Sequence, residues 1–380
     1  MSARKIALWH EAGVIDAATR DRLLAYEADH ARPLALWAVW GIGALAIGLG
    51  FVSVVAANWE DIPGLVRLCV HLALIAGLLA LLFLREGRLA AKSPWAVEAL
   101  AFITVALGLT FFGHLGQVYQ TSSPLWQPLA VWLALFAPML LLTGRSWPTA
   151  LAVVGGAVWT AWEYASAMSS YGSGDGAWHA WLAFVIALPV LFAPVAAALR
   201  VRGNRPDFWR RVEELPLAYA VAGASLATVI ASIGEYGTSG LTREFFNMLI
   251  SGGVAVIAAV AVVFARPGTS GRMAGAIIGG AGLVLPLAYG ADELTVPAAF
   301  LFFALWAGIA AAALVAHWRG VFQLAVGVIA LRLIILSFEL AADLLTSGFG
   351  LILSGLMILG VAWVAVRVSK RFVPDAEPDA

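Results

Sequence analysis

Residues 244–266 read EFFNMLISGGVAVIAAVAVVFAR, and no charged side chain lies between Glu244 and Arg266. A helix that crosses the hydrocarbon core of a bilayer needs about 20 consecutive, mostly apolar residues. This stretch has that length, with an acid at one end and a base at the other. Similar uncharged stretches recur along the chain, so the sequence predicts an all-α, polytopic membrane helix bundle.

The composition of the chain supports the same class of protein. The 380 residues are 62% hydrophobic and 12% charged, whereas a soluble domain has about 25% charged residues. A charged side chain at the centre of a bilayer costs about 2.5–3.5 kcal/mol on insertion scales, which explains why the charges gather in short stretches. Cys69 is the only cysteine, so a disulfide framework or a CxxC site within one chain is excluded.

The uncharged stretches predict about twelve transmembrane helices. A cytoplasmic helical hairpin is expected over residues 1–33, the transmembrane domain over 34–367, and a cytoplasmic tail over 368–380. The predicted helices cover residues 34–57, 62–84, 95–113, 126–143, 147–165, 178–199, 215–234, 245–265, 272–290, 294–316, 320–338 and 345–367.

The distribution of charges predicts the sidedness of these helices. Lys and Arg gather in the loops on the cytoplasmic side of a membrane. Nearly all of them fall on the side that also holds both termini, with Arg67, Arg243 and Arg332 as the exceptions. The opposite side collects acids: Glu60, Asp61, Glu163, Asp175, Glu235, Glu244, Asp292, Glu293, Glu339 and Asp343. We therefore expect both termini in the cytoplasm.

The segment before residue 33 has the pattern of two short helices. Gly13 can end the first helix, and Asp16 can cap the N-terminus of the second. The hairpin either covers the cytoplasmic side of the membrane domain or binds a cytoplasmic partner.

Three groups of polar residues are candidates for a functional site, because polar side chains are costly in a membrane protein. The first group, Asn58, Glu60 and Asp61, follows the first predicted span. It forms either a solvated turn or the mouth of an outward-facing cavity.

The second group lies in the predicted loop between the third and fourth spans. It contains His114, Gln117, Tyr119 and Gln120. Amides and an imidazole suit neutral hydrogen-bonding ligands such as sugars, but they also satisfy loop backbone.

The third group is Arg332 with Glu339 and Asp343 near the outer end of the eleventh predicted span. We expect Arg332 to be buried against a carboxylate, with Glu163 as the first choice, or to hold an anionic ligand. The chain has no Walker loop, HExxH or GxSxG pattern. The sequence therefore predicts no cofactor, no metal and no nucleic-acid partner.

Several motifs in the first 150 residues carry a family resemblance. They are Trp9 with Gly13 and Ile15, AANW at 56–59, Ile62-Pro63 with Arg67, and GQVYQ at 116–120 with Leu125-Trp126. With these motifs the chain resembles the bacterial predicted-membrane-protein family known as domain of unknown function 2157. The resemblance implies a bacterial inner-membrane location and supplies no catalytic residues.

Three functions remain open from the sequence. The leading hypothesis is a transporter or flippase-like permease with an outward-facing polar site, with a small-molecule or lipid-linked ligand. The second is a membrane enzyme that acts on a lipid-linked envelope substrate, with Glu60 or Asp61 as general base. The third is a non-catalytic scaffold or sensor that recruits a partner through the N-terminal hairpin.

Overall fold

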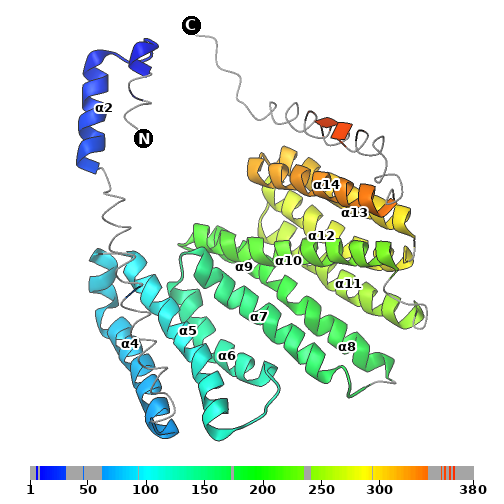
Figure 1. Ribbon diagram of the computed structural model, residues 1–380, viewed down its shortest axis with the longest axis horizontal. Coiled ribbons are helices and arrows are strands. Elements are labelled where there is room, and N and C mark those ends of the chain that lie inside the picture. The colour runs from blue at the N-terminus through cyan, green and yellow to red at the C-terminus, as the bar shows by residue number, and fades with distance from the viewer. Residues whose placement is uncertain are drawn as a thin grey trace. The chain divides into compact units, whose positions relative to one another are not determined.

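The computed structural model describes residues 9–30, 62–92, 94–172, 175–234, 241–292 and 294–340, together with a few single positions outside these ranges. Every element among the described residues is a helix (Figure 1). The chain forms two compact units, Met1–Arg67 and Leu68–Ala380.

In the first unit, a turn at Gly13 connects a short helical segment to α2 (Ala17–His30). Gly13 has a φ of 71°, and the N–H of Val14 donates to the Trp9 carbonyl at 2.9 Å. The Asp16 carboxylate accepts a hydrogen bond from the Thr19 N–H at 2.7 Å and so caps α2. Hydrogen bonds from Thr19 hold the pKa of Asp16 below its usual value. The turn at Gly13 and the cap at Asp16 agree with what the sequence predicts for this segment.

The second unit is a bundle of long helices, and the first turn of α4 lies before its boundary at Leu68. The elements in chain order are α4 (Gly64–Lys92), α5 (Pro94–Tyr119), α6 (Trp126–Thr143), α7 (Trp147–Met168), α8 (Gly176–Ala187), η1 (Leu188–Leu191), α9 (Phe192–Arg202), α10 (Pro206–Ile233), α11 (Leu241–Ala265), α12 (Thr269–Gly290), α13 (Thr295–Val315) and α14 (Arg319–Leu340). The short 3₁₀ segment η1, which contains Pro189, joins α8 and α9 into a single continuous helical stretch.

Nine helical segments among the described residues are long and apolar enough to cross a membrane. The protein is therefore a multi-pass membrane protein. The helix α7, which carries Trp159, Trp162 and Glu163, is not among the nine, although the sequence predicts a span there. The predicted spans over 34–57 and 345–367 lie outside the described ranges, so the total of twelve stays a prediction.

Several helices continue beyond the predicted spans. The helix α4 extends to Lys92 rather than residue 84, α5 extends to Tyr119 rather than residue 113, and α10 begins at Pro206 rather than residue 215. A helix satisfies its backbone hydrogen bonds internally, so it can continue into the interface after its apolar segment has ended.

Close contact between α11 and α12 forms the most tightly packed part of the bundle. A Cβ at Gly282 would lie 2.7 Å from the Gly252 carbonyl oxygen, and a Cβ at Gly275 would lie 2.5 Å from a Val263 methyl group. Only glycine permits this approach of two backbones. The same core includes buried alanines of α9, α10 and α13, such as Ala197 and Ala224.

Candidate functional site

Some of the predicted site residues lie outside the described part of the chain. These are Asn58, Glu60, Asp61 and Asp343, and the side chain of Glu339. The first polar group, and with it the general base of the enzyme hypothesis, therefore stays a prediction.

His114 lies within α5 and not in a loop, because α5 continues past residue 113. Its side chain is buried, and its Nδ1 lies 3.4 Å from Nδ1 of His71 in α4. The Nε2 of His71 lies 3.0 Å from the Leu107 carbonyl, so this nitrogen must be the donor. If both rings are neutral, His71 accepts at Nδ1 and His114 donates at Nδ1. The pair thus links α4 to α5.

The other residues of the second group do not join this pair. Gln117 and Tyr119 are exposed in the last turn of α5. Gln120 follows with a positive φ of 51°, in the turn where the Thr121 N–H donates to the Gly116 carbonyl. Among the described contacts, nothing brings these side chains to a common ligand site.

Arg332 is buried, as predicted, with 3% of its surface exposed. Its guanidinium donates to Ser232 Oγ of α10 at 2.7 Å and lies 5.9 Å from the ring centre of Phe302 in α13. Glu163, the expected partner, instead accepts a hydrogen bond from Trp159 Nε1 on its own helix, at 3.0 Å. The expectation that Glu163 pairs with Arg332 had no support from the sequence on which helices are neighbours.

Two buried carboxylates, Glu98 of α5 and Glu213 of α10, each make several polar contacts with other helices. Glu98 accepts hydrogen bonds from Arg145 N, Ser146 N and Thr149 Oγ1 at the N-terminus of α7. The sequence assigned it no role.

The second buried carboxylate is Glu213, whose exposed fraction is 3%. It pairs with Arg200 at 2.9 Å and with Arg266 at 3.1 Å. Burial lowers the pKa of Arg266, and the charge of Glu213 opposes this effect. These contacts hold α9, α10 and the α11–α12 turn together.

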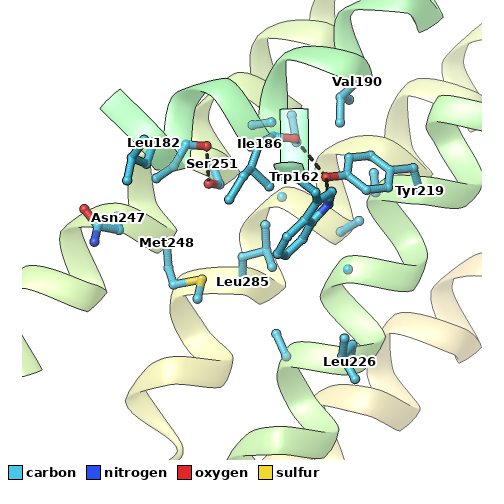
Figure 2. A pocket seen from close by; sticks show the side chains of 18 of the residues that line it. Trp162, Leu182, Ile186, Val190, Tyr219, Leu226, Asn247, Met248, Ser251 and Leu285 are labelled. Atoms are coloured by element: carbon cyan, nitrogen blue, oxygen red, sulfur yellow. Dashed lines mark hydrogen bonds between the residues drawn. The ribbon is translucent and has the colours of Figure 1, made fainter. Parts of the chain in front are cut away.

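A cavity of about 380 Å³ lies between α7, α8, α10, α11 and α12 (Figure 2). Small-molecule sites commonly have volumes of about 300–1,000 Å³. Its lining is almost entirely apolar: Leu182, Ala183, Ile186, Ala187, Val190, Ala220, Gly223, Leu226, Ala227, Ile230, Met248, Ala255, Ala281, Gly282 and Leu285. The remaining lining residues are Trp162, His179, Tyr219, Asn247 and Ser251.

Hydrogen bonds between helices hold the walls of this cavity. Trp162 Nε1 of α7 donates to the Tyr219 hydroxyl of α10 at 2.9 Å, and this hydroxyl donates to the Ile186 carbonyl of α8 at 2.8 Å. Ser251 Oγ of α11 donates to the Ala183 carbonyl at 3.0 Å. Figure 2 shows both sets of bonds at the edge of the cavity. The hydroxyls of Tyr219 and Ser251 are therefore already engaged by the protein.

His179 and Asn247 lie at one end of the cavity. Each is one turn before the hydrogen-bonded pair of Ala183 and Ser251. Ser251 of α11 bonds to Ala183 of α8, and further along both stretches Arg266 and Arg200 bind the same Glu213 carboxylate, so α8–α9 and α11 run in the same direction. At about 1.5 Å per residue, the cavity wall from Asn247 to Ala255 is about 12 Å long. The cavity thus has an amide and an imidazole at one end, and the polar atoms of its other lining residues Trp162, Tyr219 and Ser251 are hydrogen-bonded within the protein.

Gly223 leaves open space in the wall of α10. A Cβ at this position would meet no atom within 4 Å. Gly253 on α11 has the same open surroundings but does not line the cavity. Among the described residues, no group of three or more His, Cys, Asp or Glu is placed to hold a metal ion.

The fold and the cavity together define a multi-pass membrane protein with a mostly apolar cavity among its helices. Residues 7–149 match the family described as "Predicted membrane protein (DUF2157)", which confirms the resemblance over that part of the chain. Neither the curated proteins nor the solved structures contain a significant match to the chain. Every residue that lines the cavity comes after the matched segment.

Proposed function

We propose that the protein is a flippase-like permease of the bacterial inner membrane that moves a lipid-tailed solute through the cavity between α8 and α10. The observation that carries this proposal is a ligand-sized cavity whose walls lie within helices of membrane-spanning length. An apolar lining lets a hydrocarbon chain enter without loss of its favourable environment, and the polar end can hold a headgroup.

The proposed topology has about twelve spans with both termini in the cytoplasm. Asp175 precedes α8 and Glu244 lies in the first turn of α11, and this topology places both on the outer side. The end of the cavity that holds His179 and Asn247 then faces outward. The proposed permease thus has an outward-facing polar site, as expected from the sequence, but this site consists of different residues.

The helices around the cavity differ in how they contact one another. Backbone packing through Gly252 and Gly282 joins α11 to α12, and α10 packs on α9, α12 and α13. Between α8 and α10, the main connection is the hydrogen bond that Tyr219 donates to the Ile186 carbonyl. In the proposed mechanism, α8 moves relative to α10 when this bond breaks, and the opening of the cavity changes.

The proposal is tested by lipid translocation in proteoliposomes. A fluorescent phosphatidylcholine and a fluorescent glucosyl lipid are placed in both leaflets, and the fraction accessible to an external quencher is followed over time. Protein-containing vesicles should expose the inner-leaflet pool of at least one probe faster than protein-free vesicles. If neither probe is exposed faster in protein-containing vesicles than in protein-free vesicles, the proposal is overturned.

A pair of variants links any translocation to the cavity. Gly223→Leu places a side chain in the cavity, where its Cβ meets no atom, and should slow translocation at least tenfold. Gly253→Leu adds the same side chain outside the cavity and should leave the rate unchanged. Loss of translocation in both variants, or in neither, would exclude the cavity as the path.

A further inference from the structure

We infer that the ligand of this cavity is a lipid with an uncharged, hydroxyl-rich headgroup, as in a glycosyl lipid, with its chain along α10 and its headgroup at Asn247 and His179. This inference rests on the proposed function, because it names the class of solute that the same cavity takes.

The apolar part of the ligand follows from the lining and from the openings of the cavity. Leu226 of α10 is 58% exposed, although it lines the cavity and lies seven residues before the end of its helix. An exposed side chain at that depth in a spanning helix meets lipid and not water. The cavity is therefore open sideways to the bilayer, and a lipid chain can enter it laterally.

The polar end of the cavity can both accept and donate hydrogen bonds. The Oδ1 of Asn247 has no hydrogen-bond partner among the described residues, and the amide nitrogen of the same side chain carries two N–H donors. The Nδ1 of His179 lies 2.8 Å from the Asp175 carbonyl, so this nitrogen is the donor, and Nε2 is left for a ligand. An amide and an imidazole at the end of the cavity fit the hydroxyls of a sugar, because a hydroxyl both donates and accepts.

The lining of the cavity itself supplies no counter-charge for an ionic headgroup. None of the described lining residues is Lys, Arg, Asp or Glu. A phosphate or an ammonium group would have to give up its hydration without an opposite charge, which costs several kcal/mol. A hydroxyl pays a smaller desolvation cost, because a hydrogen bond to Asn247 or His179 replaces a hydrogen bond to water.

The chemistry of the headgroup is tested by competition in nanodiscs that contain the full chain. The probe is an alkyl glucoside with a photoreactive diazirine in its chain, and the labelled peptides are mapped by mass spectrometry. Dodecyl glucoside, dodecyl phosphate and dodecyltrimethylammonium, which share one chain, serve as competitors. Labels should fall on the cavity walls of α8, α10 and α11, and dodecyl glucoside should compete at least tenfold better than either ion.

Two substitutions test the role of Asn247. Asn247→Ala should weaken competition by dodecyl glucoside about tenfold, as expected for the loss of one hydrogen bond. The control is Asn204→Ala, at an exposed position before α10, and it should have no effect. Asn247→Asp should make dodecyltrimethylammonium the better competitor, because it adds a negative charge at the same place. This gain of a new preference separates a direct contact from a loss of folding.

The outcomes separate this inference from the proposed function. If the glucoside labels the cavity but no probe is translocated, the ligand class stands and the permease proposal fails. If only phosphatidylcholine is translocated and Gly223→Leu blocks it, the permease stands and the ligand class fails. Labels spread over the outer helix surfaces, or better competition by either ion, would overturn the inference.

Discussion

Thr149 Oγ1 donates a hydrogen bond to the carboxylate of Glu98 at 2.7 Å, and both residues are buried. Glu98 lies in α5 and Thr149 in the first turn of α7, so one carboxylate caps a helix to which it does not belong. Its charge also interacts favourably with the positive end of the α7 dipole. This contact fixes where α7 begins relative to α5.

Replacement of Glu98 by Gln should therefore destabilise the protein. The amide keeps one acceptor but loses the charge that strengthens three hydrogen bonds, so we expect the free energy of unfolding to fall by about 2–3 kcal/mol. Thermal unfolding in detergent measures the change. Glu86→Gln, at an exposed position in α4, is the control and should have little effect. Equal shifts for the two variants would show that the cap does not stabilise α7.

Glu213 and Glu214 provide a matched pair of neighbours in α10. Glu213 is buried between Arg200 and Arg266, whereas Glu214 is 49% exposed and lies 3.7 Å from Arg210. Glu213→Gln leaves the buried Arg266 and the partly buried Arg200 without their counter-charge and should lower the free energy of unfolding by about 3–5 kcal/mol. Glu214→Gln should cost less than about 1 kcal/mol. Unfolding curves of both variants decide the point, and similar losses would contradict the buried network.

Arg332 should act as a structural residue that depends on Ser232. Ser232→Ala removes an acceptor from a buried guanidinium, so the free energy of unfolding should fall by about 1.5–3 kcal/mol. Ser169→Ala, at an exposed position after α7, is the control. If Ser232→Ala is as stable as the control, the hydrogen bond between Ser232 and Arg332 does not stabilise the fold.

The helices could be predicted from the sequence to a large extent, because the bilayer imposes a strong length and charge pattern. The predicted span over 126–143 coincides with α6, since Trp126 follows a proline-containing loop and Gly144-Arg145 ends the helix. At α5 the prediction stopped too early. His114 looks like a loop residue in the sequence, but in the fold it pairs with His71 and stays helical.

The cavity could not be predicted in the same way. Its walls are apolar side chains from five helices, and no local pattern distinguishes them from lipid-facing ones. Asn247 and Ser251 did carry a signal, because they are the only side-chain hydrogen-bonding groups between Glu244 and Arg266. No role could be assigned to these residues from the sequence, because Asn58 and Gln117 lie in more conspicuous polar groups.

The sidedness of the proposed topology is tested by cysteine accessibility. In a Cys69→Ser background, a cysteine at Ser170, after α7, should react with a membrane-impermeant thiol reagent added to intact cells. A cysteine at Asn204, before α10, should react only after the membrane is permeabilised. Both positions are exposed, so their reactivity reports the side of the membrane. Reversed labelling would place the basic loops outside and contradict the topology.

The central claim, that a lipid-tailed solute crosses through the cavity, is tested most directly by the translocation rate in a series of side chains at Gly223. Because the space around Gly223 is open, Ala, Leu and Phe at this position fill the cavity by increasing amounts. We expect the rate to fall steadily along this series and to stay constant along the same series at Gly253. A rate that is independent of side-chain size at Gly223, or that falls equally at both positions, would contradict the claim.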